Sequence, residues 1–179
     1  MPETIREPVS FLSLEEIEKQ AQEILERHNL KTLPINPLTL AHRAGVKVNN
    51  ARFTDENLAG MIVKRGDDVL ILVAQDDPPF RKRFTIAHEL AHHFLHLIRD
   101  GEYVDNEVDL FRLQTSDRSE ASPTRRQEIQ ANLFAASLLM PEHEVRRYWD
   151  ERRSIEDLAR AFNVSEEAMG YRVTSLGLD

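Results

Sequence analysis

The sequence predicts an α+β domain in which a small sheet of about three strands packs on a mainly helical core, with a helical appendage at the C-terminus. Three short strand-like runs lie within residues 46–73, whereas most other apolar residues recur at helical spacing. The chain has 179 residues, 41% of them hydrophobic and 30% charged, which is typical of one globular domain with a core.

Two helices are expected before the sheet, preceded by a flexible lead-in at residues 1–12. Ser13 can cap the first helix, because Glu16 stands three residues later at the spacing of a capping box. The second helix is short and begins with Asn36 as its N-cap and Pro37 at its first position.

The sheet is expected to begin with Val46–Val48, directly after the second helix ends at Gly45. Two further strand-like runs, residues 58–64 and 69–73, flank the sequence R-G-D-D at 65–68. Since a short run of this kind is a turn signal, the pattern predicts a β-hairpin that joins the first strand in one small sheet.

Two long helices are expected after the sheet, at about residues 79–98 and at 123–140. Ser122 is the expected N-cap of the second, and Pro123 occupies its first position. Between these helices, residues 99–121 are strongly acidic and poor in apolar side chains. We interpret this stretch as a long, partly mobile loop near a binding cleft, with solvated surface as the alternative for its charges.

The C-terminal part is expected to form three short helices, at about residues 142–152, 154–162 and 165–175. They read as a helix-turn-helix-like group attached to the preceding helices. We therefore divide the chain into a main part at residues 13–141 and a C-terminal helical subregion of the same domain at 142–179.

Charge and cysteine content narrow the function. The net charge of −8 disfavours non-specific binding to nucleic acid or to an anionic membrane. The absence of cysteine excludes disulfides, thiolate zinc sites and cysteine nucleophiles, so any metal must be held by His, Asp or Glu. The N-terminus shows no secretory signal, and no stretch approaches about 18 apolar residues, so we expect a cytoplasmic protein that does not cross a membrane.

The pattern H-E-x-x-H occurs at His88, Glu89 and His92. On a helix, the two histidines face the same way about 6 Å apart along the axis, so that both imidazoles can bind one divalent cation. Glu89 lies about 100° around the helix, where it can take a proton from a water molecule at the cation. This is the zincin arrangement.

The alternative for this pattern is a surface helix with incidental polar residues. The flanking sequence favours a metal site, because it is apolar around most of the helix. A charged glutamate and two histidines would be costly on a buried helix without a partner, and a metal supplies that partner. The apolar neighbours are Ile86, Ala87, Leu90, Ala91, Phe94, Leu95, Leu97 and Ile98.

A zinc site of this kind requires a third protein ligand. Glu128 is the favoured candidate, because it is the only carboxylate of the second long helix and heads a stripe along which two helices can approach closely. Asn132, one turn later, can support Glu128 or a ligand histidine. Glu128 could instead pair with Arg125. The other candidate ligands are His143, Asp105, Glu107, Asp109 and Glu120.

Four segments of the chain resemble the ImmA/IrrE family of metallopeptidases, and the resemblance covers roughly residues 37–178. The first segment contains R-F-T-I-A-H-E-L-A-H, and the second contains E-I-Q-A-N-L-F-A-A and L-L-M-P. These two segments are specific when found together, and the C-terminal segments also fit. The segments are residues 83–96, 128–141, 158–165 and 172–178.

The resemblance implies a zincin-like fold, with residues 13–141 as the metallopeptidase domain. It implies His88 and His92 as metal ligands, Glu128 as the third ligand and Glu89 as the general base. Zn²⁺ is the implied cofactor, with Mn²⁺ as the alternative. The implied function is that of a metal-dependent endopeptidase that cleaves a helix-turn-helix repressor and thereby switches on stress-response or mobile-element genes. Some relatives carry a C-terminal sensory domain, which we do not expect here.

Peptide hydrolysis also requires residues at the rim of the site. A tetrahedral oxyanion needs a donor besides the metal, and Tyr103, Arg125 and Arg126 are the candidates. His96 lies about 12 Å along the helix from His88, which is too far to share the ion. We therefore expect His96 at the rim of the cleft, or as a hydrogen-bonded histidine at the helix end.

Two other functions compete with peptide hydrolysis. Residues 154–168 read as a helix-turn-helix, which would make the protein a DNA-binding regulator. Its recognition helix would begin with Ser165–Glu167, and acidic residues outnumber basic ones between residues 142 and 172, so we expect no direct nucleic-acid binding. The third function is a protein-binding module with weak or no catalysis, against which the intact Glu89 argues.

Overall fold

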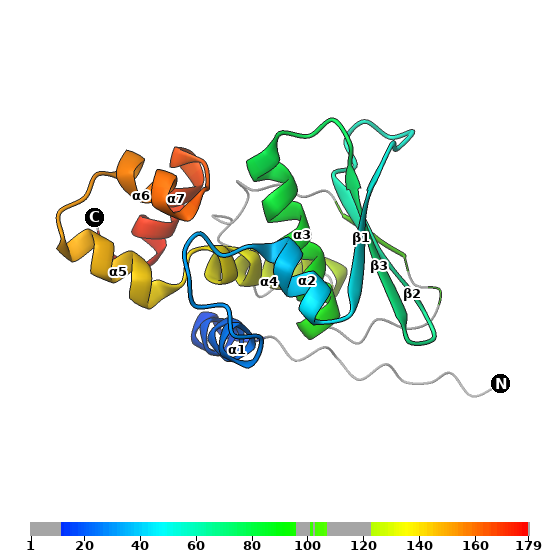
Figure 1. Cartoon of the computed structure of the whole chain (residues 1–179), viewed down its shortest axis with the longest axis horizontal. Helices are drawn as coiled ribbons and strands as arrows, with labels where there is room; N and C mark the ends of the chain where they lie inside the picture. Colours follow the sequence, from blue (N-terminus) through cyan, green and yellow to red (C-terminus); the bar gives the residue numbers. More distant parts are fainter. Residues whose placement is uncertain (1–11, 96–100, 102, 107–122, 179) are drawn as a thin grey trace.

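The computed structural model describes residues 12–95, 101, 103–106 and 123–178. Within these residues the predicted α+β class is confirmed, because a small sheet packs on a group of helices. Figure 1 shows the sheet at one end of the molecule and the C-terminal helices at the other, with the two longest helices between them. Among the helices in the described part of the chain, none is long and apolar enough to cross a membrane.

The sheet contains four strands in the order β1-β3-β2-β4. β3 is parallel to β1 and antiparallel to β2, and β2 is antiparallel to β4. One face of the central strands is buried through Ile62, Val69, Ile71 and Val73, and helix α3 packs against β2 and β3. The strands are β1 (Val46–Ala51), β2 (Gly60–Arg65), β3 (Asp68–Ala74) and β4 (Tyr103–Asn106).

The predicted hairpin is confirmed, and β4 corrects one expectation. Gly66 takes a φ of 59° in the turn between β2 and β3, where a two-residue hairpin turn requires a positive φ. β4 lies in the acidic stretch 99–121, so the prediction of a loop is wrong at residues 103–106. Four residues in acidic surroundings carry no strand pattern of their own, and the pairing comes from the edge of β2. The rest of that stretch lies outside the described residues.

The first two helices begin at their predicted caps. The N–H of Glu16 donates to Oγ of Ser13 at 3.2 Å, and the N–H of Ser13 donates to Oε2 of Glu16 at 2.7 Å, which completes the capping box. Oδ1 of Asn36 accepts from the N–H of Leu38 at 3.0 Å. The helices are α1 (Leu14–Arg27) and α2 (Pro37–Arg43).

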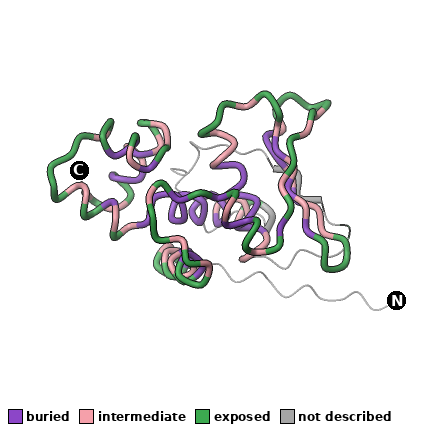
Figure 2. Tube along the Cα trace, viewed as in Figure 1, coloured by how far each residue is buried: buried purple, intermediate pink, exposed green. Residues whose placement is uncertain are grey.

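The two long helices, α3 (Pro79–Leu95) and α4 (Pro123–Leu139), form the centre of the molecule. Figure 2 shows that both are buried over much of their length. Every residue is buried from 84 to 92 in α3 and from 130 to 139 in α4. The H-E-x-x-H pattern therefore lies on a buried helix rather than on a surface helix. Residues 96–98, expected to continue α3, lie outside the described residues.

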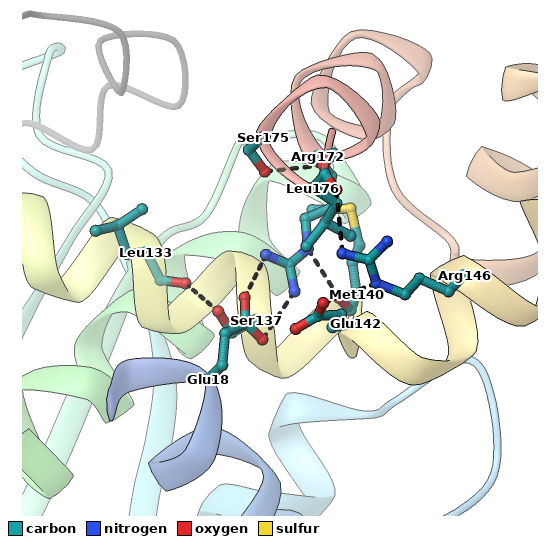
Figure 3. A network of polar contacts seen from close by, with 9 residues as sticks. All are labelled: Glu18, Leu133, Ser137, Met140, Glu142, Arg146, Arg172, Ser175 and Leu176. Carbon is teal, nitrogen blue, oxygen red and sulfur yellow. Dashed lines mark hydrogen bonds and ion pairs between the residues drawn. The ribbon is translucent and has the colours of Figure 1, made fainter. Parts of the chain in front are cut away.

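Three short helices follow α4, as predicted, and two arginines attach them to the rest of the molecule. Arg172, which is 4% exposed, donates to the carbonyl of Met140 at 3.0 Å and pairs with Glu18 of α1 (Figure 3). Arg83 of α3 donates to the carbonyl of Asn163, which lies between the last two helices, at 3.2 Å. The helices are α5 (Glu142–Asp150), α6 (Ile155–Phe162) and α7 (Glu166–Ser175).

Candidate metal centre

Three side chains from two helices meet in the seam between α3 and α4. Nε2 of His88 lies 3.1 Å from Nε2 of His92 and 3.1 Å from Oε2 of Glu128. Nε2 of His92 lies 3.5 Å from Oε1 of Glu128. The structure thus brings together the three residues that the sequence analysis selected as ligands, and this group could hold a metal ion.

The separations between these donors fit a zinc ion. Zinc ligands lie about 2.0–2.1 Å from the ion in tetrahedral sites, so neighbouring donor atoms are about 3.3–3.4 Å apart. The observed separations of 3.1 Å and 3.5 Å lie on either side of this value. Two imidazoles and one carboxylate are also a donor set of catalytic zinc sites, in which the fourth position is left for water.

The sequence of the two helices explains why the donors converge. His88 and His92 are one turn apart on α3, and their ring centroids lie 4.9 Å apart. Small buried side chains occur on both helices, so the helix axes can approach closely. These small residues are Ala87 and Ala91 in α3, and Ala131 and Ala135 in α4.

Asn132 orients one of the histidines. Its Oδ1 accepts a hydrogen bond from Nδ1 of His88 at 2.8 Å. Because a carbonyl oxygen cannot donate, this bond places the proton of a neutral His88 on Nδ1 and leaves the Nε2 lone pair facing the other two donors. Of the two contacts expected for Asn132, the structure shows the one to a histidine.

Burial and mutual contact set the protonation of the three groups. Burial lowers the pKa of His92 below its ordinary value. Burial also opposes the charged form of His88, but the hydrogen bond to Glu128 and the nearby carboxylates outweigh it and raise the pKa of His88. Burial would raise the pKa of Glu128, yet the hydrogen bonds with both histidines lower it to about 2. A proton and a metal ion therefore compete for the same donors.

Glu89 lies on a different flank of α3. Its side chain is fully buried, and its Oε1 would be 3.3 Å from a Cβ atom at position 60 of β2. The carboxylate therefore lies on the side of α3 that meets the sheet, whereas His88 and His92 meet α4. This agrees with the rotation of about 100° between consecutive helical residues.

The other predicted site residues are not brought into this group by the described structure. His143 lies on α5, where its side chain is 59% exposed. Arg125 and Arg126 lie in the first turn of α4. Tyr103 and Asp105 lie in β4, the edge strand that pairs with β2. The remaining candidates lie outside the described residues: His96, Glu107, Asp109 and Glu120.

Gly60 and Thr85 lie beside Glu89 where β2 meets α3, and neither was predicted from the sequence as a site residue. Both are buried, and a Cβ atom at position 60 would overlap the Cγ2 methyl of Thr85. An isolated glycine inside a strand pattern is a sign of close backbone approach, and this signal could have identified Gly60.

Comparisons with known proteins indicate the family and the fold of the chain. The family model of peptidase M78, described as the IrrE N-terminal-like domain, matches residues 41–174. Among solved structures, a Mycobacterium tuberculosis transcriptional regulator is similar with a TM-score of 0.62 and 21% sequence identity. The similarity covers 89% of this chain and 46% of that one, so this chain spans less than half of that protein. At this identity the likeness concerns the fold alone. No curated protein matches the chain significantly.

Proposed function

The chain belongs to the peptidase M78 family with the IrrE N-terminal-like domain, and we propose that it is a metal-dependent endopeptidase. The observation that supports this proposal best is the convergence of His88, His92 and Glu128, whose donor atoms all lie within 4.8 Å of one another. In this proposal these three residues hold Zn²⁺, with Mn²⁺ as the alternative, and Glu89 is the general base.

When bound, the ion lowers the pKa of a water molecule and polarises the scissile carbonyl. The protein supplies the orientation and the proton transfer. Asn132 holds the imidazole of His88 by its Nδ1 atom, which keeps Nε2 directed at the ion. The carboxylate of Glu89 accepts a proton from the water and later returns it to the leaving amine. The burial of Glu89 strengthens its electrostatic interaction with the reacting groups.

We propose a helix-turn-helix repressor as the substrate, whose cleavage switches on stress-response or mobile-element genes. This choice rests on the resemblance to the ImmA/IrrE family, which implies a repressor partner. One structurally similar protein is named a transcriptional regulator, and this name supports the choice of a substrate involved in gene regulation.

A DNA-binding role for the C-terminal helices is the second candidate, because α6 and α7 are joined by a turn with Asn163 in the left-handed conformation. Two features oppose it. Glu166 and Glu167 are exposed at the start of α7, where a recognition helix would approach phosphates. Arg172 of α7 is buried against Glu18 and is therefore not available to DNA.

The proposed function is tested by incubating the protein with candidate helix-turn-helix repressors, chosen first from the genes that neighbour its own. We expect cleavage that EDTA abolishes and that Zn²⁺ or Mn²⁺ restores. Cleavage that persists after complete metal removal would contradict a metal-dependent reaction. Tight, sequence-dependent DNA binding by the isolated protein, without cleavage, would favour the regulator instead.

A further inference from the structure

A glycine of strand β2, Gly60, lies against the flank of α3 that carries Glu89. A Cβ atom at Gly60 would overlap the Cγ2 methyl of Thr85, and it would lie 3.3 Å from Oε1 of Glu89. It would also lie 3.0 Å from the carbonyl oxygen of Leu72 on the neighbouring strand. No side chain larger than hydrogen therefore fits at position 60 without movement of its neighbours.

Backbone conformation does not account for this glycine. Gly60 lies inside β2 and is not among the residues with a positive φ. In a strand of ordinary conformation, alanine is normally preferred to glycine, because glycine loses more conformational freedom on folding. The requirement at position 60 is thus one of space, set by the helix that packs on the strand.

The strand has little freedom to move away from the helix. Gly60 is paired on both sides, with Val73 of β3 and with Asn106 of β4. The preceding residue, Ala59, accepts a hydrogen bond from the N–H of Ala74 at 2.8 Å. A side chain at position 60 would therefore be accommodated by displacement of α3 or of its side chains rather than by displacement of β2.

The helix side of the contact consists of residues one turn apart. Thr85 and Glu89 are separated by four residues on α3, so both side chains face β2, and both are fully buried. A buried carboxylate has no solvent into which it can withdraw. A side chain at position 60 that clashes with Thr85 or with Oε1 of Glu89 would therefore displace the carboxylate itself.

We propose that Gly60 is a positioning residue for Glu89: by carrying no side chain, it sets the distance between β2 and α3 and leaves room for the carboxylate. This inference rests on the proposed function, in which Glu89 transfers the proton. Reactions of this kind are sensitive to displacement of the reacting groups by about 1 Å, which costs about a hundredfold in rate.

The test compares four variants with the wild type: Gly60→Ala, Thr85→Ser, the double variant that combines both, and Gly170→Ala. Thr85→Ser removes the methyl group that a Cβ at position 60 would overlap. Gly170 is the matched control, because a Cβ there meets nothing within 4 Å. Each variant is measured for thermal unfolding without metal, for Zn²⁺ affinity, and for kcat and KM on a quenched peptide that spans the bond cleaved in the experiment above.

We expect Gly60→Ala to lower kcat by about tenfold or more, with KM and Zn²⁺ affinity within about twofold of wild type. Its Tm should fall, whereas Gly170→Ala should keep or raise the Tm and leave kcat unchanged. Thr85→Ser added to Gly60→Ala should restore most of both losses. A purely structural role for Gly60 would lower Tm and Zn²⁺ affinity together and leave kcat close to the wild-type value.

The inference is overturned if Gly60→Ala keeps the wild-type kcat, if its Tm rises like that of Gly170→Ala, or if Thr85→Ser brings no recovery. A wild type without metal-dependent cleavage would refute the proposed function instead. In that case the two thermal shifts alone would decide whether Gly60 and Thr85 form the contact.

Discussion

Nε2 of His88 lies 3.1 Å from Oε2 of Glu128, although the two residues are 40 positions apart in the sequence and belong to different helices. Glu128 remains 24% exposed, whereas His88 is fully buried. The carboxylate therefore reaches from the edge of the seam to a histidine inside it. This contact places the third donor of the candidate metal site opposite the two histidines of α3.

Removal of Glu128 should weaken metal binding. Glu128→Ala deletes one of three protein donors, so we expect Zn²⁺ affinity to fall by about a hundredfold or more. Glu167→Ala, which removes an exposed carboxylate from α7, is the control and should leave affinity unchanged. Competition with a chelator of known affinity measures both. Wild-type affinity in Glu128→Ala would show that Glu128 is not a ligand.

Removal of Asn132 should also lower the affinity for metal, but by less than removal of Glu128. Asn132→Ala deletes the acceptor that holds Nδ1 of His88, and the loss of such supporting contacts typically costs about 10–100-fold in metal affinity. The same chelator competition applies. An affinity equal to that of wild type would mean that the packing of α3 alone orients His88.

The stability of the metal-free protein should depend on Glu128 in a pH-dependent way. Folding lowers the pKa of Glu128 from 4.5 to about 2, so its carboxylate contributes stability above pH 4.5 that is lost as the pH falls toward 2. The free energy of unfolding of wild type should therefore exceed that of Glu128→Gln by on the order of 1–3 kcal/mol at pH 6, and this difference should shrink below pH 4.5. Because the pKa of His88 is raised in the folded protein, the stability that His88 contributes is fully present at pH 6.

Urea unfolding in EDTA at pH 6, 4 and 3 measures that difference. The control is Glu23→Gln, which changes an exposed carboxylate of α1 and should show no such trend. A stability difference between wild type and Glu128→Gln that grows as the pH falls would have the wrong sign and would contradict the pairing.

Loss of Arg172 should destabilise the whole molecule. Arg172→Met leaves Glu18 without its buried partner, and breaking a buried pair costs about 3–5 kcal/mol. Arg160→Met is the matched control, because Arg160 is 70% exposed in its pair with Glu156. Loss of this exposed pair should lower the free energy of unfolding by about 1 kcal/mol or less. Denaturant unfolding measures both.

We propose that residues 13–141 and 142–179 form one domain. The protein should then unfold in one transition, which Arg172→Met shifts as a unit, and two separate unfolding transitions would contradict this.

Local features of the fold were predictable from the sequence, and features that depend on tertiary contact were not. The starts of α1 and α2 follow from caps within three residues, at Ser13 and Asn36. The strand β4 was missed because its pairing partner is β2, about forty residues earlier, and not a pattern in its own four residues. The pair of Arg172 and Glu18 spans 154 positions and leaves no local signal.

The candidate site shows the same division. His88, Glu89 and His92 lie within one helical turn, so their spacing alone identifies them as a group. To predict Glu128 as the third ligand, a second helix had to be assumed to pack along the first, and the resemblance to a known family was needed as well. Gly60 was missed because its significance lies in the distance between β2 and α3, which exists only after the chain has folded.

Glu89→Gln is the sharpest test of whether Glu89 transfers the proton in a metal-dependent cleavage. This variant is nearly isosteric, so the packing against Gly60 and Thr85 is kept while the carboxylate charge is removed. Bound zinc and cleavage of the repressor are measured on the same preparations of wild type and variant. We predict that Glu89→Gln keeps about one zinc ion per chain and loses cleavage by about a hundredfold or more. Cleavage at the wild-type rate with zinc bound would show that Glu89 does not transfer the proton.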